Sequence, residues 1–156
     1  DALFQVHFAD VQNRLDRVLQ ANTSDNPLLP LRNGILKNFQ KLSQDPDFKK
    51  FSTILHLRCE QTDENQNIVK LIQKYHQVWD QHLLAIFEHS KQQEILPPNL
   101  NSQMALVLLT SMLSGLTTKW LSAPEPFALQ EYAPKLIQMY FDNLAHSSLL
   151  REVDNE

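Results

Sequence analysis

The chain has 156 residues, enough for one domain with a single core, and 42% of them are hydrophobic while 21% are charged. Two glycines against eight prolines are few for a sheet-rich fold, because hairpin turns use glycine freely, so the composition favours helices joined by proline-marked loops. The formal net charge of −4, without a cluster of Lys and Arg, argues against nucleic-acid binding by these residues themselves.

Six helices and no strand are predicted. The first is expected at residues 2–21, on an apolar stripe that ends in a cluster of turn formers. The second is expected at residues 30–42. The third has the clearest start signal, with Asp45 as N-cap and Pro46 at the first helical position, and it is expected to run to about residue 60.

The fourth helix, at residues 64–92, is predicted to be the longest. The fifth, at residues 102–121, is apolar almost all round, so it must be covered on more than one side. The sixth is expected at residues 129–146, with Pro134 tolerated in its opening turns. The polar tail at residues 151–156 is expected to be frayed.

The fifth helix carries small side chains at roughly i, i+3, i+4 and i+7, namely Ser111, Ser114, Gly115 and Thr118. Small residues at this spacing allow another helix to approach closely. One interpretation is close packing inside the subunit. The other is that the last two helices pair with their copies across a two-fold axis in a four-helix bundle. The pattern alone leaves both open.

The search for chemistry finds no catalytic constellation. The six histidines include no i, i+4 pair, no Glu-x-x-His motif is present, and two isolated glycines cannot form a phosphate-binding loop. The nearest approach to a metal pair, His82 with His89, is interpreted as a solvated edge. The single cysteine, Cys59, is expected to be a small buried hydrophobe. No enzymatic activity, cofactor or metal is therefore predicted.

Polar groups embedded in apolar faces give one candidate site. They lie on the third, fourth and fifth helices, and they are Phe51, Leu55, Tyr75, Trp79, Thr110, Ser114 and Lys119. Aromatic walls with a few polar handles are typical of a cavity for a drug-sized amphipathic ligand. They are also typical of an ordinary core in which Trp and Tyr find hydrogen-bond partners, and the pattern alone favours that interpretation.

Eight short stretches, taken in order, carry a resemblance over nearly the whole chain. They are Asp1–Phe4, Leu57–Thr62, Gln77–Trp79, Leu113–Leu116, Lys119–Ser122, Pro126–Leu129, Ala133–Pro134 and Asp142–Leu144. In this order and spacing the chain resembles the C-terminal domain of TetR-family transcriptional repressors, in the AcrR/MtrR branch that controls multidrug efflux pumps. The resemblance implies an all-α ligand-binding and dimerisation domain of six helices, whose last two helices form a four-helix dimer bundle.

The resemblance also implies a domain organisation and an interface. Residues 1–156 are expected to be the effector-binding and dimerisation domain, and operator DNA is expected to be bound only through a helix-turn-helix domain upstream of them. The protein is expected to be a cytoplasmic homodimer without membrane contact, since the apolar run of residues 104–116 is too short to span a bilayer. The expected interface residues are Leu108, Ser111, Met112, Gly115, Thr118, Leu136, Tyr140 and Phe141.

Site residues carry over unevenly. Trp79 falls where the MtrR branch has a pocket-lining tryptophan. Thr110, Ser114 and Lys119 fall on pocket positions that are charged in that relative, and only Lys119 keeps a charge. Phe8 falls where the AcrR relative has a pocket glutamate. These departures favour neutral or anionic apolar effectors over cationic drugs.

The expected function is therefore ligand sensing in a repressor of an efflux-pump gene, in which a small apolar or amphipathic effector releases the full-length dimer from DNA. The alternative is a helical dimeric interaction module with a filled core and no ligand. An enzyme would need a catalytic pair for which the sequence offers no candidate.

Overall fold

The computed structural model describes residues 6, 9, 10, 13, 16, 17, 26–58, 66–123 and 127–153. Its elements are α2 (Leu28–Gln44), α3 (Pro46–Thr53), the π-helical turn η2 (Ile54–Arg58), α4 (Gln66–Gln92), α5 (Ser102–Ser122), α6 (Leu129–His146) and the short 3-10 helix η4 (Ser148–Leu150). The six described residues before residue 26 are also helical, within the span predicted for the first helix. The predicted all-α class is confirmed. Within these ranges, one isolated β-bridge pairs Leu100 with Arg151.

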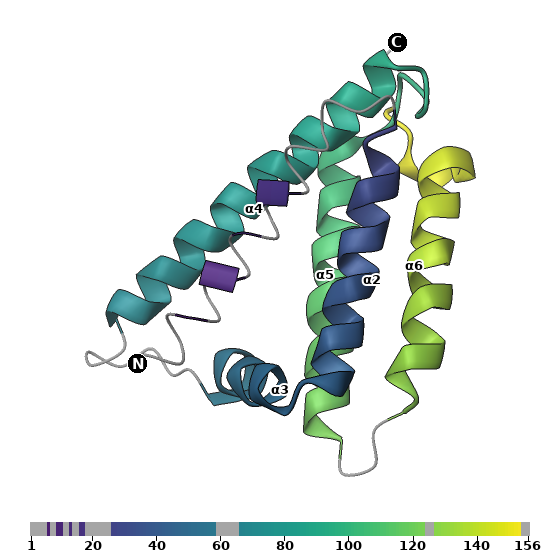
Figure 1. The fold of residues 1–156 in the computed structure, drawn as a ribbon. Helices are drawn as coiled ribbons and strands as arrows, with labels where there is room; N and C mark the ends of the chain where they lie inside the picture. Colours follow the sequence, from purple (N-terminus) through teal and green to yellow (C-terminus); the bar gives the residue numbers. More distant parts are fainter. Residues whose placement is uncertain are drawn as a thin grey trace.

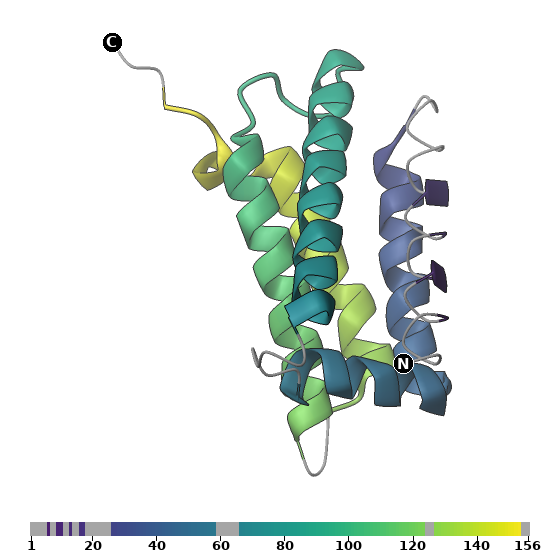
Figure 2. The same ribbon diagram turned by 90° about the vertical axis from the view of Figure 1, so that its left-hand side faces the viewer.

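In Figure 1, α2, α5 and α6 run in nearly the same direction, and α4 is inclined to them and meets them at one end. α2 packs on α6, and α4 packs on α5. Figure 2, turned by 90°, shows α2 on one side of the molecule and α4 and α5 on the other, with α3 crossing the end of both. α3 contacts both α2 and α5, so it closes the bundle at that end.

Two helix starts are fixed by side-chain caps. The Asp45 carboxylate accepts hydrogen bonds from the backbone N–H groups of Asp47 at 3.0 Å and Phe48 at 3.2 Å, which confirms the predicted N-cap of α3. At α5, the Asn101 side chain accepts from the Met104 N–H at 3.1 Å. These bonds satisfy backbone donors that the first turn of a helix leaves unpaired.

The third helix differs from the prediction of a continuous helix to residue 60. It is α-helical only to Thr53, and Ile54–Arg58 form a π-helical turn, a rare form that often occurs at functional sites. Ile54 and Leu57 are about two-fifths exposed on this turn, while Leu55 packs against the core. No residue of the segment signals a π turn in the sequence.

The core lies between α2, α4, α5 and α6. Its fully buried large side chains include Leu31, Leu42, Leu83, Ile86, Phe87, Leu109, Ile137 and Leu144. α5 contributes only one side of its surface to this core, because Met104, Val107 and Leu108 remain 48%, 53% and 42% exposed. Among the described helices, α5 is also long and apolar enough to cross a membrane by composition, a test that core helices of soluble proteins also pass.

Tyr140 connects α6 to α5 inside the subunit. Its side chain is 2% exposed, and its hydroxyl donates a hydrogen bond to the Ala105 carbonyl at 2.7 Å. Burial raises the pKa of Tyr140 above its ordinary value, so the hydroxyl stays protonated and remains a donor. A buried phenol needs such a partner because an unsatisfied hydroxyl in the core is costly.

The chain after α6 is anchored rather than frayed. The Arg151 guanidinium donates to the Leu144 carbonyl at 3.0 Å, and the Glu152 N–H donates to the Asn99 carbonyl at 2.7 Å. The Asn101 N–H donates to the carbonyl of buried Leu150 at 2.8 Å. The prediction of a frayed tail is therefore wrong for residues 151 and 152, and residues 154–156 lie outside the described ranges.

A second polar link joins α4 to the start of α5. The Ser102 hydroxyl donates to Glu88 Oε1 at 2.7 Å, and the Lys91 ammonium lies 3.1 Å from the same oxygen. These contacts lower the pKa of Glu88, first through the Ser102 hydrogen bond and then through Lys91, because both favour the ionised carboxylate.

Replacing Tyr140 by Phe should lower the free energy of unfolding by about 1 kcal/mol, because the substitution removes a hydrogen bond from the core. Urea denaturation followed by circular dichroism measures this change. Tyr132→Phe is the matched control, because Tyr132 is half exposed, and it should cost less than about 0.5 kcal/mol. Equal losses in the two variants would contradict a stabilising role for the Tyr140 hydroxyl.

Glu88→Gln should lower the free energy of unfolding by about 0.5 kcal/mol at pH 7, a small value because the carboxylate is partly exposed. Folding lowers the pKa of Glu88, so its contribution is present above the unfolded pKa and is lost as the pH falls through the folded pKa. In urea melts, the difference between the variant and the unmodified chain should fade as the pH falls through the lowered folded pKa of Glu88. In a Ser102→Ala background the effect of Glu88→Gln should shrink; an unchanged effect would show that the Ser102 bond is not its source.

Candidate functional site

Two aromatic side chains of α4 were predicted to line the ligand site. Tyr75 and Trp79 lie one turn apart and are both half-buried. Trp79 packs against the buried core, and the Tyr75 ring lies 5.9 Å from the ring of His76. One edge of the indole therefore contacts packed side chains while part of it stays accessible.

The third helix supplies a wall to the same core. Phe51 is buried, with its ring centre 6.2 Å from that of Phe48, and Leu55 on the π turn is half-buried against the core. Both α3 and η2 contact α5. Phe51, Leu55 and Trp79 thus belong to one hydrophobic cluster. Such a cluster is compatible both with the predicted ligand site and with an ordinary core.

A cation–aromatic contact that the sequence analysis missed lies beside this wall. The Lys49 ammonium is 4.6 Å from the ring centre of Trp120, which is only 8% exposed. A cation over an indole face is attracted by the ring quadrupole, so this contact stabilises the crossing of α3 over the end of α5. The two residues are far apart in the sequence, and no local spacing signals their contact.

His56 on the π turn is another residue to which the sequence assigned no role. Loss of surrounding water lowers the pKa of His56, although part of its side chain remains exposed, and the charge of His76 on α4 lowers it further. A lowered pKa keeps the imidazole neutral at pH 7. The π turn therefore carries a neutral polar ring that lies close enough to His76 of α4 to be affected by its charge.

The predicted polar residues of α5 differ in their exposure within the subunit. The Thr110 hydroxyl is half-buried but donates to the Leu106 carbonyl of its own helix at 2.9 Å. Ser114 and Lys119 are exposed in the subunit, and their assignment to the ligand site stays a prediction. Phe8 lies outside the described residues.

The predicted interface residues divide by exposure. Leu108, Ser111 and Gly115 are exposed on α5, and a Cβ added at Gly115 would meet no atom within 4 Å. Tyr140 is buried inside the subunit and offers no surface to a second copy, so its assignment to the interface was wrong. The remaining four, Met112, Thr118, Leu136 and Phe141, are half-buried.

Further exposed apolar side chains extend this surface. On α5 they are Met104 and Val107, and on α6 they are Tyr132 and Met139, which are 50% and 58% exposed. With Leu108 they form what we call the α5–α6 apolar face. A signal for them existed in the sequence, because the fifth helix is apolar all round, but which side the subunit covers depends on packing.

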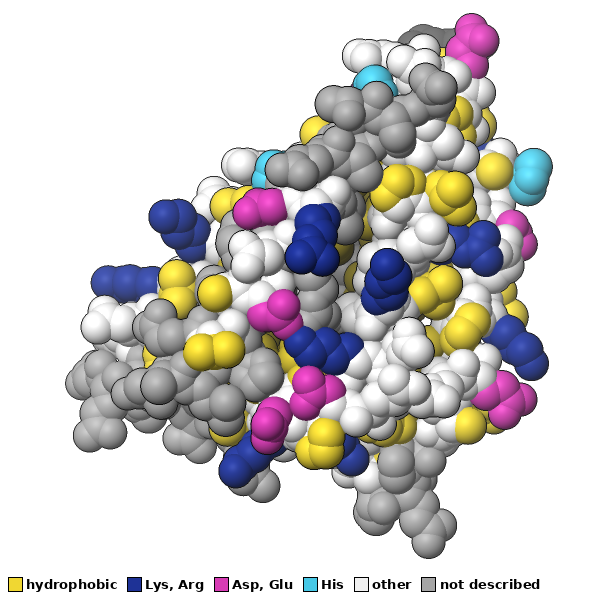
Figure 3. All heavy atoms as spheres, viewed as in Figure 1, with side chains coloured by type: hydrophobic (Ala, Val, Ile, Leu, Met, Phe, Trp, Pro, Cys, Tyr) yellow, Lys and Arg dark blue, Asp and Glu magenta, His cyan; other side chains and the backbone are white. Residues whose placement is uncertain are grey.

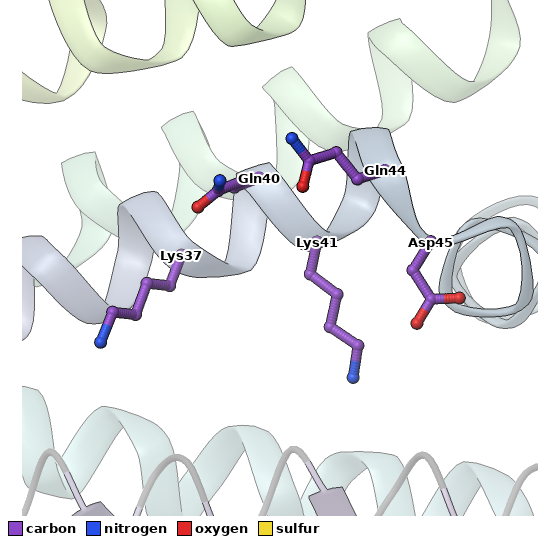
Figure 4. Close-up of a pocket in the computed structure, with 5 residues that line it drawn as sticks. All are labelled: Lys37, Gln40, Lys41, Gln44 and Asp45. Carbon is purple, nitrogen blue, oxygen red and sulfur yellow. The ribbon is translucent and has the colours of Figure 1, made fainter.

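Two surface hollows lined by described residues run along α2. One has a volume of about 370 Å³ and is lined by Lys37, Gln40, Lys41, Gln44 and Asp45, which Figure 4 shows along α2 and at its end. The other, about 460 Å³, lies between α2 and α6. Neither includes a residue predicted to bind ligand. Within the described ranges, no three His, Cys, Asp or Glu side chains gather as a metal site.

Residues 26–146 match the family described as MAATS-type transcriptional repressor, C-terminal region. The chain belongs to the TetR family of transcriptional repressors. TetR-family repressors are soluble cytoplasmic proteins that are not enzymes and that act as DNA-binding dimers with small-molecule effectors. The apolar length of α5 is therefore weak evidence for a membrane span.

Two curated relatives from Pseudomonas putida align with nearly the whole chain of this TetR-family protein. The HTH-type transcriptional regulator TtgR is 27% identical over 154 residues, which are 97% of this chain and 70% of the relative. The probable HTH-type transcriptional regulator ArpR is 27% identical over 157 residues, with the same coverage.

Two solved structures share the fold of this TetR-family chain. MexZ, described as a key repressor responsible for antibiotic resistance in Pseudomonas aeruginosa, superposes with a TM-score of 0.73 at 19% identity, over 88% of this chain and 72% of MexZ. NalD, described as the secondary repressor of the MexAB-OprM multidrug efflux pump in the same species, gives 0.63 at 24% identity, over 86% and 72% of the two chains.

Proposed function

We propose that residues 1–156 are the effector-sensing and dimerisation part of a TetR-family repressor of an efflux-pump gene. The match of residues 26–146 to the C-terminal region of such repressors carries this proposal. The operator is read by a helix-turn-helix segment outside these residues, in keeping with the names of TtgR and ArpR. NalD, which has a similar fold, represses a multidrug efflux pump, and this supports the choice of regulated gene.

The effector in this proposal is a neutral or anionic apolar molecule that contacts Trp79. Half-buried Trp79 and Tyr75 supply aromatic walls, and the π turn beside them supplies Leu55 and the neutral imidazole of His56. Such a surface offers apolar contact area with few fixed charges, which suits ligands that differ in shape but share low polarity.

Release from DNA follows from linkage. The effector must bind better to the conformation that does not fit the operator, and DNA must then weaken effector binding by the same factor. In the dimer, two helix-turn-helix units must reach major-groove half-sites about 34–36 Å apart. A small change in the geometry of the subunits therefore changes the fit to both half-sites.

Dimerisation uses the α5–α6 apolar face in this proposal. Met104, Val107 and Leu108 are unusually exposed for side chains of their size, and beside them Ser111 and Gly115 leave room for a second helix. Pairing of α5 and α6 with their copies across a two-fold axis would remove this surface from water in a four-helix bundle. A dimeric interaction module without a ligand would use the same interface, and ligand titration distinguishes it from an effector-sensing domain.

Gly115→Arg should split the dimer while leaving the subunit folded. The isolated subunit has open space beside Gly115, so an arginine meets no steric obstacle there, whereas it would place a charge inside the helix pairing. Analytical ultracentrifugation at about 20 µM should show a dimer for the unmodified chain and a monomer for the variant.

Gly115→Ala and Gln81→Arg are the controls. The alanine is small and stabilises the helix by up to about 1 kcal/mol, and exposed Gln81 on α4 tests the effect of an added surface charge. Both should remain dimeric. A monomeric unmodified chain, or a dimer that persists in Gly115→Arg, would reject the α5–α6 apolar face as the interface.

Trp79 should report effector binding directly. The chain has two tryptophans, so Trp120→Phe leaves the emission of Trp79 alone. A steroid or bile acid added to this variant should quench the emission saturably, and it should raise the melting temperature of the unmodified chain. In Trp79→Phe, affinity should fall by about tenfold, the loss expected for an aromatic wall. Absence of both quenching and thermal stabilisation would favour the module without a ligand.

A further inference from the structure

The larger hollow beside α2 has an apolar floor made by two helices. Phe39 of α2 and Leu129 and Ala133 of α6 are buried and form this floor, and Leu36 and Pro134 form its sides. Figure 3 shows apolar side chains between the strips of surface belonging to α2 and α6. We call this hollow the α2–α6 groove. Its volume of about 460 Å³ is in the range of small-molecule sites.

The rim of the groove is polar and carries no acidic residue. Asn33, Gln40, Gln44 and Gln130 provide carboxamide groups, and Lys37 provides an ammonium group. The Lys37 side chain extends to the side of α2 opposite Gln40 and Gln44 in Figure 4, but it is exposed on a flexible stem, so its charge can rotate toward the groove. Every one of these side chains can donate a hydrogen bond to a carboxylate, and none repels it.

One amide of the rim is already held in place. Gln130 Nε2 donates to Ser43 Oγ at 3.0 Å, and the Ser43 hydroxyl donates to the Gln40 carbonyl at 2.9 Å. This chain of bonds links α6 to α2 across the end of the groove. Ordering the rim before a ligand arrives reduces the entropy that binding must oppose.

The smaller hollow shares Lys37, Gln40 and Gln44 but suits an anion less well. It is also lined by the carboxylate of Asp45, and the ammonium of Lys41 is paired with Asp10. Figure 4 shows Gln40 and Gln44 extending from one side of α2, and Lys37, Lys41 and Asp45 extending from the other. An anion would therefore meet less repulsion in the α2–α6 groove.

We propose that the α2–α6 groove binds small aromatic carboxylates, as a second ligand site separate from Trp79. The ring covers the apolar floor, and the carboxylate accepts hydrogen bonds from the carboxamides and from Lys37. At about 100° per residue, Gln130 and Pro134 lie on nearly the opposite side of α6 from Tyr132 and Met139. A ligand in the groove therefore leaves the α5–α6 apolar face free.

The test uses 2-naphthoate and the ¹⁵N-labelled 156-residue chain, observed by heteronuclear NMR. Titration should shift backbone amide signals of α2 and α6 around the groove, with a dissociation constant of about 1 mM or lower. Lys37→Glu should weaken binding at least about fivefold, because it reverses the charge at the rim. Lys50→Glu, at another exposed lysine, should change it less than about twofold.

A blocking variant and a cationic analogue test separately whether binding uses the groove floor and whether it requires the carboxylate. Gln130→Trp places a ring over the floor without altering a buried position and should abolish the shifts, while Glu131→Trp, at the exposed neighbouring residue, should not. 2-Naphthylmethylamine, with the same ring and a positive charge, should bind at least about fivefold more weakly. Circular dichroism confirms that each variant is folded.

Three results would overturn the second site: no shifts at about 5 mM naphthoate, equal affinity in Lys37→Glu, or shifts confined to α4 near Trp79. Retention of naphthoate binding by Trp79→Phe supports the groove whatever the outcome of the effector titration. The two proposals can therefore fail independently of each other.

Discussion

The structure depends on how the apolar surface of α5 is divided. One side, with Ala105, Leu106 and Leu109, packs into the core, while Met104 and Val107 on the other side remain exposed. An ordinary surface helix keeps an apolar stripe on one side only, so the second side calls for a partner of its own. In a TetR-family repressor this constraint joins stability to oligomeric state, because the surface that one subunit cannot cover is available to its copy.

Polar contacts then decide where the helices meet. The Tyr140 hydroxyl fixes α6 on α5 from inside the core, and the Ser102 hydroxyl fixes the start of α5 on α4 through Glu88. Hydrophobic packing tolerates small sliding movements, whereas a hydrogen bond tolerates little, so these contacts set the register of the helices. The relative positions of the aromatic side chains around Trp79 therefore depend on this register.

The sequence predicted features with local causes well and those with distant causes poorly. The cap formed by Asp45 before Pro46 follows from chemistry within one turn, and the structure confirms it. The sixth helix was also predicted at residues 129–146, where α6 lies, yet the bounds of a helix do not tell which neighbour covers each residue. Tyr140 was therefore assigned to a second subunit when α5 of the same subunit covers it. The exposure of Ser114 and Lys119 in the subunit could not be predicted either, since only packing fixes the rotation of α5.

The segment after α6 is hydrogen-bonded to the connection between α4 and α5, and the two ends of the bundle therefore differ in how firmly their helices are held. At that end Arg151 and Glu152 bind the carbonyls of Leu144 and Asn99 by directional hydrogen bonds. At the other end, the crossing of α3 over α5 includes the contact of Lys49 with Trp120, which is less directional. The helices are thus held more rigidly at the end with the directional hydrogen bonds, and they can move apart more freely at the end where α3 crosses.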